Sequence, residues 1–119
     1  MTEPLTNSID RATFTELQET TGTEFTAELV DAFLDEAPQL LEQLTAALTA
    51  GQANNFRRTA HSLKTNALTF GALTLAAQAR ELEQRSIDSV KTDGANPLDA
   101  LAQEYARVAA ALKALSHAA

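Results

Sequence analysis

The sequence contains no cysteine, and its purely apolar runs are short. The first absence excludes disulfide frameworks, thiolate metal sites and cysteine nucleophiles. The second argues against a membrane-spanning helix, because crossing a bilayer takes about 20 consecutive apolar residues. The segment Met1-Thr2-Glu3-Pro4 also lacks the basic residues that begin a signal peptide. We therefore expect a cytoplasmic protein.

Basic residues are scarce and unevenly distributed. The 119 residues include nine Lys and Arg against 16 Asp and Glu, a net charge of -7, which argues against general binding to nucleic acid or anionic lipid. Residues 1–50 hold ten carboxylates and one basic residue, Arg11, whereas residues 51–119 hold eight basic and six acidic residues. The simplest interpretation is that the early carboxylates coat solvated helix faces. A basic cluster in the second half therefore stands out.

Length and composition predict one folded domain. Hydrophobic residues make up 45% of the chain and charged residues 21%, which is typical of globular proteins. No internal segment resembles a linker between two domains. We expect the domain to span residues 9–115, with flexible ends at residues 1–8 and 116–119.

Helical periodicity dominates the sequence and predicts an all-α fold, because no stretch shows the sustained alternation of a strand. Asp10 is placed to cap a first helix, and Ile9 to pack on Phe14 in its first turn. Gly22 is suited to end this helix. A second helical region follows from there to about Gly51.

Pro38 lies inside the second helical region and lacks a backbone donor, so we expect either a kink or a break into two helices there. Three further helices are predicted, at residues 53–70, 72–90 and 97–115. Short connections favour antiparallel neighbours. The sequence therefore predicts an antiparallel up-and-down four-helix bundle with the short first helix as an N-terminal cap.

His61 is predicted to face water from the helix at residues 53–70. At 100° per residue, the apolar residues of this helix gather in one stripe whose centre lies roughly 140° from His61. They are Phe56, Ala60, Leu63, Ala67 and Phe70. Packing in the core does not explain the position of this imidazole, although a solvated surface histidine is a common feature.

Three cations are predicted to share the exposed face with His61, namely Arg57, Arg58 and Lys64. Cations favour the neutral imidazole, which is the nucleophilic form. They would also attract a phosphoryl donor and partly neutralise the phosphorylated ring. Leu68 is the one sizeable apolar residue on this face and is a candidate seat for the apolar surface of a partner.

The residues around His61 resemble the signature of histidine-containing phosphotransfer (HPt) domains. The central likeness consists of Ala60-His61-Ser62-Leu63-Lys64, Phe70-Gly71-Ala72, Leu75-Ala76 and Leu82-Glu83. Upstream, the matching positions are Ile9-Asp10, Thr21-Gly22, Phe33, Pro38 and Leu44. The resemblance therefore covers roughly residues 9–115.

The resemblance implies a helical phosphoryl carrier in a multistep His-Asp two-component relay. His61 would take a phosphoryl group from an aspartate of one receiver domain and pass it to an aspartate of another. Lys64 would help to hold the phosphoryl oxygens, and Gly71 matches the later glycine of the motif. The surface around the histidine would be shaped by Arg57, Arg58, Thr65, Leu68 and Gly71.

The same resemblance implies a protein that has no catalytic machinery and no cofactor of its own. The Mg²⁺ ion of the reaction would belong to the receiver. We expect the partners to be receiver domains of response regulators or of a hybrid histidine kinase, with no nucleic acid or membrane involved. We also expect a monomer.

The sequence departs from the commonest HPt pattern just after the histidine. That pattern has glycine four residues on and then a small residue, whereas this chain has Thr65 and Asn66. Thr65 projects about 40° from His61. Its branched side chain would narrow the approach of a receiver, or its hydroxyl would bond the imidazole or a phosphoryl oxygen.

Two other binding or signalling interpretations are open. In the dimerisation helices of a sensor kinase, an acidic residue typically follows the histidine and a proline comes a few positions later. Here Ser62 follows, and the next proline is Pro97. The other interpretation is a helical interaction module with an HPt-like fold and no phosphoryl exchange, in which His61 is incidental.

An independent enzyme has little support. The sequence has no glycine-rich phosphate loop. Glu81 and Glu83 are two residues apart on a predicted helix, so their side chains diverge. His117 is interpreted as a solvated residue near the end of the chain, and Tyr105 as a packing residue.

Overall fold

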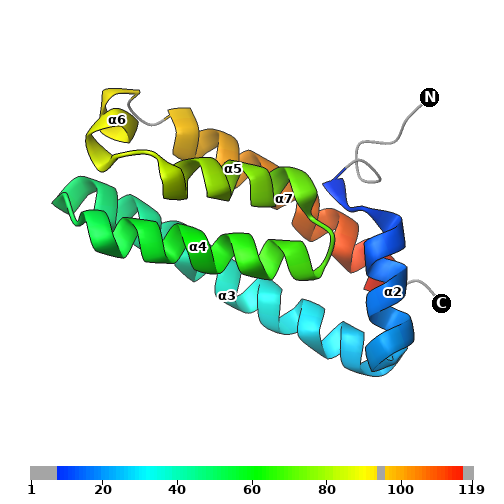
Figure 1. Cartoon of the computed structure of the whole chain (residues 1–119). Helices are drawn as coiled ribbons and strands as arrows, with labels where there is room; N and C mark the ends of the chain where they lie inside the picture. The colour runs from blue at the N-terminus through cyan, green and yellow to red at the C-terminus, as the bar shows by residue number, and fades with distance from the viewer. Residues whose placement is uncertain (1–7, 94–95, 117–119) are drawn as a thin grey trace.

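The computed structural model describes residues 8–93 and 96–116, and most of them are helical (Figure 1). The helices are α2 (Arg11–Thr21), α3 (Thr23–Ala50), α4 (Ala53–Thr69), α5 (Leu73–Gln84), α6 (Ile87–Thr92) and α7 (Asn96–Ser116). These described residues include no strand, so the all-α prediction is confirmed. None of these helices is long and apolar enough to cross a membrane.

The predicted ends of the domain lie close to the limits of the described structure. Of the segments expected to be flexible, residues 1–7 and 117–119 lie outside the described residues. Ser8 is 3% exposed, and α7 ends at Ser116.

α2 begins and ends at the residues that the sequence indicates. The carboxylate of Asp10 accepts the backbone N–H of Thr13 at 3.1 Å, as an N-cap does. Ile9 and Phe14, on either side of this cap, are both buried, in keeping with the predicted apolar contact. Gly22 ends α2 with a φ of 90°.

α3 continues through Pro38 without a break, so the alternative of two separate helices is wrong. Proline has no N–H to donate to the carbonyl four residues earlier, which belongs to Leu34. The hydroxyl of Tyr105 on α7 donates to that carbonyl at 3.4 Å. A side chain of the neighbouring helix thus supplies a donor where the proline removes one.

The turn between α4 and α5 depends on Gly71, whose φ of +79° is one that L side chains rarely adopt. A Cβ at this position would lie 2.8 Å from the carbonyl oxygen of Asp10 and 2.9 Å from Cβ of Thr13. The carbonyl of Gly71 accepts the backbone N–H of Asp10 at 2.7 Å. Gly71 is therefore a buried residue that joins the turn to the start of α2, and it is not part of an exposed partner surface.

The single helix predicted at residues 72–90 is wrong, because α5 ends at Gln84 and α6 begins at Ile87. Ser86 caps α6 by accepting the N–H of Ser89 at 3.2 Å. Arg85 donates to the Ser89 carbonyl at 2.9 Å and pairs with Asp93. A capping serine offers the backbone an alternative to continuing the helix. The spacing of apolar residues gives no sign of this alternative, so it predicted one continuous helix.

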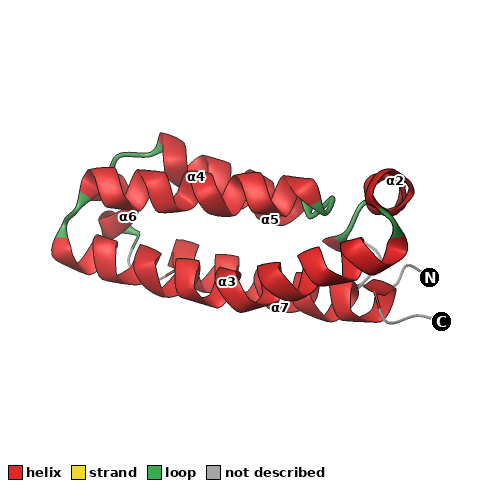
Figure 2. Ribbon diagram, turned by 90° about the horizontal axis from the view of Figure 1, so that it is seen from below, coloured by secondary structure: helices red, strands yellow, loops and turns green. Residues whose placement is uncertain are grey.

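The four long helices α3, α4, α5 and α7 pack against one another and alternate in direction along the chain (Figure 1). Figure 2 shows α4 and α5 in one layer and α3 and α7 in the other, with α2 lying across one end. The core lies between the layers. Phe33 of α3 contacts Phe70 at the end of α4 and Tyr105 of α7, with ring centroids 5.2 and 6.0 Å apart.

Candidate functional site

α4 presents His61 on the side opposite to the core. The five residues of the predicted stripe are buried, namely Phe56, Ala60, Leu63, Ala67 and Phe70. The side chain of His61 is 57% exposed. The predicted orientation of this helix is confirmed, since burying the apolar stripe turns the opposite side towards solvent.

A carboxylate from the neighbouring helix holds the ring of His61. Oε2 of Glu83, on α5, lies 2.7 Å from Nδ1 of His61. An ionised carboxylate has no hydrogen to donate, so we assign the hydrogen to Nδ1. In the neutral ring, this tautomer leaves the lone pair on Nε2, and Nε2 is then the nucleophilic atom.

The same carboxylate also binds Lys64, whose Nζ donates to Oε1 of Glu83 at 2.8 Å. The side chains of Lys64 and Glu83 are 22% and 20% exposed, so Lys64 is mostly buried and paired, whereas it was predicted to face water. The hydrogen bond from Lys64, followed by that from His61, lowers the pKa of Glu83 below its ordinary value of 4.5. Glu83 is therefore ionised at neutral pH.

An open groove surrounds His61. Its lining residues come from α4 and α5 and are Arg57, Arg58, His61, Ser62 and Glu83. Both arginines are exposed, and the guanidinium of Arg57 donates to Oδ1 of Asn54 at 3.1 Å. Exposed guanidinium groups beside a nucleophilic nitrogen suit a phosphoryl group, because arginine matches the geometry of phosphate oxygens.

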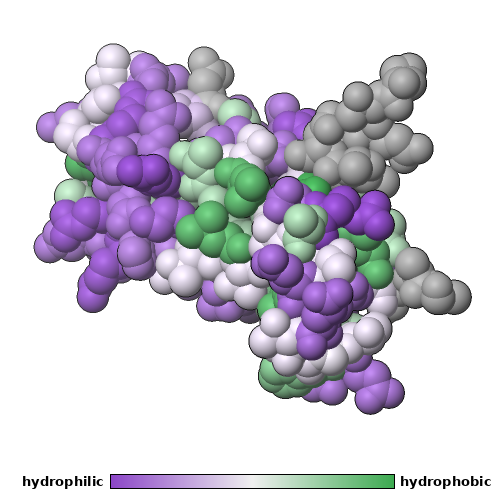
Figure 3. Space-filling model, turned by 45° about the vertical axis from the view of Figure 1, so that its right-hand side comes forward, coloured by the Kyte–Doolittle hydropathy of each residue, from purple (hydrophilic) through white to green (hydrophobic). Residues whose placement is uncertain are grey.

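A second groove begins at Lys64 and is mostly apolar. It is lined by Lys64, Leu68, Leu73, Ala76, Ala77 and Arg80. Leu68 and Leu73 are 48% and 51% exposed and line this groove together, and exposed apolar residues that form one patch can mark an interaction site. Figure 3 shows apolar residues gathered between hydrophilic surfaces on the face it presents. The sequence singled out Leu68 but not Leu73, which is the first residue of the next helix, α5.

Thr65 is exposed on α4, as expected. Its backbone carbonyl accepts the hydroxyl of Thr69 at 3.2 Å. Within residues 8–93 and 96–116, the side chain bonded to His61 is Glu83 and not Thr65.

Glu83 is the site residue that sequence reasoning missed. It was part of the quoted motif, yet it was given no role beyond a comparison with Glu81. A usable signal was present, since His61 lies ten residues before Gly71 and Glu83 lies twelve after it. Two antiparallel helices that meet at this glycine place the two side chains opposite each other.

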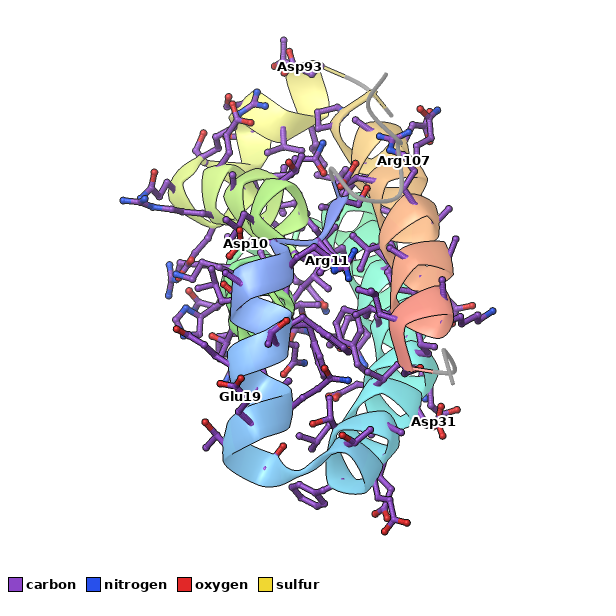
Figure 4. The ribbon with its side chains drawn as sticks, turned by 90° about the vertical axis from the view of Figure 1, so that its right-hand side faces the viewer. Asp10, Arg11, Glu19, Asp31, Asp93 and Arg107 are labelled. Carbon is purple, nitrogen blue, oxygen red and sulfur yellow. The ribbon has the colours of Figure 1, made fainter. Side chains whose placement is uncertain are left out.

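The early carboxylates that the structure describes face solvent, as predicted, and Glu3 lies outside the described residues. Every described Asp and Glu between residues 10 and 42 is exposed. Figure 4 shows Glu19 of α2 and Asp31 of α3 on the outside of the molecule. Within the described part of the chain, no group of three or more His, Asp or Glu side chains is placed to hold a metal ion.

Two comparisons with known proteins agree with this geometry. Residues 28–118 match the family described as Hpt domain. The chain is similar to the crystal structure of histidine-containing phosphotransfer protein B (HptB) from Pseudomonas aeruginosa PAO1, with 29% sequence identity and a TM-score of 0.84. The match covers 92% of this chain and 94% of that chain. No curated protein sequence matches. The match over most of the sequence shows that the chain belongs to the Hpt domain family.

Proposed function

We propose that this protein is a phosphotransfer intermediate of a His-Asp relay, in which His61 accepts a phosphoryl group from one receiver aspartate and passes it to another. The observation that carries the proposal is the state of the imidazole. His61 is exposed on α4 while Glu83 occupies its Nδ1 at 2.7 Å. Nε2 is therefore the nitrogen left for the incoming phosphorus atom.

The transfer needs one bond to form and one to break. The lone pair of Nε2 attacks the phosphorus of an aspartyl phosphate, the bond between phosphorus and the carboxylate oxygen breaks, and the aspartate leaves as a carboxylate. Lys64 and Arg58 are the cations of this chain that we assign to the phosphoryl oxygens, because positive charge stabilises the transferring group. Donation to the next receiver is the same step in reverse.

The chain's part in this reaction is to position an acceptor. We expect no cofactor on the protein itself and no autonomous enzymatic activity, with Mg²⁺ on the receiver. The relay requires release after each transfer, so contacts with receiver domains of response regulators or a hybrid kinase should be transient and modest in area. We further propose a cytoplasmic monomer folded as an antiparallel up-and-down four-helix bundle, with α2 as its cap.

The apolar groove beside Lys64 is the surface that we assign to receiver docking. Leu68 and Leu73 are each about half exposed and share this groove. Desolvating two such leucines favours association. Thr65 lies on the same helix between His61 and Leu68, so it would meet a receiver docked there.

The direct test is incubation with a phosphorylated receiver and Mg²⁺, following label on this chain. His61→Gln should abolish acceptance, since an amide nitrogen is not a nucleophile of this kind. His117→Gln is the matched control and should accept label as the native protein does. Label on His61→Gln equal to that on the native protein would show that the assignment is wrong.

The alternative is a helical interaction module that uses the same fold without phosphoryl exchange. It predicts that His61→Gln leaves partner binding and signalling intact and that the native protein takes no label. The hydrogen bond of His61 to Glu83, a carboxylate that also binds Lys64, favours exchange over this alternative, because an incidental surface histidine requires no such partner.

A further inference from the structure

Thr65 is an exposed threonine that lies one helical turn after His61 on α4. Side chains three or four residues apart on a helix are neighbours. Each side chain also leans back towards the helix N-terminus and covers the turn before it. The side chain of Thr65 therefore leans towards the imidazole of His61.

The contact between His61 and α5 determines where the second ring nitrogen points. Taking His61 as zero, Lys64 projects at about -60° and Leu68 at about -20° around α4. Both of these residues line a groove together with residues of α5, so α5 lies on this side of His61. Nδ1 points to α5, because it bonds Glu83. Nε2, across the ring from Nδ1, therefore points away from α5.

Two polar side chains flank His61 on the side to which Nε2 points. Thr65 projects at about +40° and Arg58 at about +60° from His61. Both are exposed, and Arg58 lines the groove at His61. A phosphoryl group on Nε2 would therefore have a guanidinium from the turn before it and a hydroxyl from the turn after it.

The hydroxyl of Thr65 is available for a new hydrogen bond. A helical threonine can satisfy its hydroxyl on the carbonyl four residues earlier, as Thr45 does on Leu41 at 3.3 Å and Thr69 does on Thr65 at 3.2 Å. In the part of the chain that the structure describes, the Thr65 hydroxyl makes no such bond to the carbonyl of His61, although its own carbonyl accepts Thr69.

We propose that the hydroxyl of Thr65 donates a hydrogen bond to a phosphoryl oxygen of phosphorylated His61. This inference rests on the proposed function of His61. The hydroxyl keeps its proton, so the bonds that form and break are those of the transfer alone. A hydrogen bond to an anionic oxygen is stronger than one between neutral groups. Thr65 thus adds a neutral donor to the cations assigned to this group.

The first test uses phosphoramidate as the phosphoryl donor, so it does not depend on knowing the receiver. Nε2 attacks its phosphorus, the bond between phosphorus and nitrogen breaks, and ammonia leaves. Thr65→Val keeps the branched shape and removes the hydroxyl, whereas Thr65→Ser keeps the hydroxyl and removes the methyl group. Thr45→Val is the control, because Thr45 is an exposed threonine of α3. Loading of His61 is followed by ³¹P NMR.

We expect Thr65→Val to load roughly fivefold more slowly than the native protein, because it loses one hydrogen bond to a charged group. Thr65→Ser and Thr45→Val should load close to the native rate. A native rate for Thr65→Val would overturn the inference, and so would a Thr65→Ser rate as low as that of Thr65→Val. A side chain that acts only as a steric obstacle would leave Thr65→Val unchanged and make Thr65→Ser faster.

A second measurement uses a receiver domain that exchanges phosphoryl groups with the native protein. The division of label at equilibrium depends on the stability of the phosphorylated and free forms and not on how the receiver docks. Because the proposed bond exists only in the phosphorylated form, Thr65→Val should shift this equilibrium towards the receiver by a similar factor. An unchanged equilibrium constant would overturn the inference.

The two proposals fail in different ways. If the native protein takes no phosphoryl group on His61 from phosphoramidate or a receiver, both are wrong. Loading of His61 that does not depend on the hydroxyl of Thr65 rejects only the role of Thr65.

Discussion

We expect Lys64 to affect both the chemistry of the site and the stability of the fold, because its ammonium bonds a carboxylate of the next helix at 2.8 Å. Lys64→Ala removes a cation that we assign to the phosphoryl oxygens. We expect transfer from a phosphorylated receiver to slow by about tenfold or more. Rapid-quench kinetics would measure this change, with Lys113→Ala on α7 as a control for the loss of one exposed lysine. Unchanged kinetics would remove Lys64 from the site.

The same variant should show a stability loss that depends on pH. The pKa of Glu83 is lowered, first by Lys64 and then by His61. A carboxylate whose pKa falls on folding adds stability above its unfolded pKa, and this contribution is lost as the pH falls through the folded pKa. Lys64→Ala should therefore cost about 1 kcal/mol or less at pH 7. Urea unfolding should show that the difference in unfolding free energy between the native protein and Lys64→Ala becomes smaller well below pH 4.5. A difference that stays constant with pH would count against the ion pair.

At the scale of single residues, the sequence predicted the exposed histidine and its cations but not the carboxylate that bonds both His61 and Lys64. His61 and Lys64 belong to one helix, where angular spacing decides which side chains share a face. Glu83 belongs to another helix, and its contact depends on the length and geometry of the turn at Gly71. A pattern within one helix carries no information about that pairing.

Among the helices, α3 and α7 are linked by the hydroxyl of Tyr105, which donates to the carbonyl that Pro38 leaves without a helical donor. Tyr105→Phe should cost about 1 kcal/mol of unfolding free energy. In a Pro38→Ala background, the new N–H of residue 38 can bond the Leu34 carbonyl, so the same substitution should cost less. Chemical unfolding of the native protein, the two single variants and the double variant gives the coupling free energy between residues 38 and 105. An equal cost of Tyr105→Phe in both backgrounds would show that the two residues are not coupled through the Leu34 carbonyl.

The conformation of Gly71, in the turn between α4 and α5, leads to a separate prediction. Gly71→Ala places a Cβ 2.8 Å from the carbonyl of Asp10, in addition to the strain of a φ of +79°. Gly51→Ala is the matched control, because its φ is +72° and the nearest atom that its Cβ would meet is Nζ of Lys91, at 3.8 Å.

The control should lose about 1–2 kcal/mol from conformational strain alone. Gly71→Ala should lose more, because α2 must also shift at its first residue. Thermal or urea unfolding compares the two variants. Equal losses would show that contact between this turn and α2 contributes nothing to stability.

The helices themselves were largely predictable, and the exceptions have clear causes. The caps at Asp10, Gly22 and Gly51 follow from local chemistry that the sequence states directly. The interruption between α5 and α6 could not be predicted in this way. The apolar spacing continues through it, and only the cap formed by Ser86 ends one helix and begins the next. The continuity of α3 through Pro38 also depends on tertiary contacts, which a local rule for proline leaves out.

Across the whole molecule, the charge is divided as the sequence indicates. The exposed carboxylates of α2 and α3 lie on solvated faces, while the cations near His61 lie on α4 and α5. An all-helical fold was expected from the helical periodicity of the sequence. The relative placement of side chains from different helices, which decides the site, required the structure.

The groups found around His61 come from α4 and α5, and residues 57–83 contain every lining residue of both grooves. The reactive surface is thus encoded in one contiguous helical hairpin, while α3 and α7 supply the opposite layer. If the proposed site is correct, we expect this hairpin to transfer partner choice and phosphoryl chemistry between related carriers. A chimaera that receives this hairpin from a second carrier should show the reactivity of that carrier, while its other helices keep their own core residues.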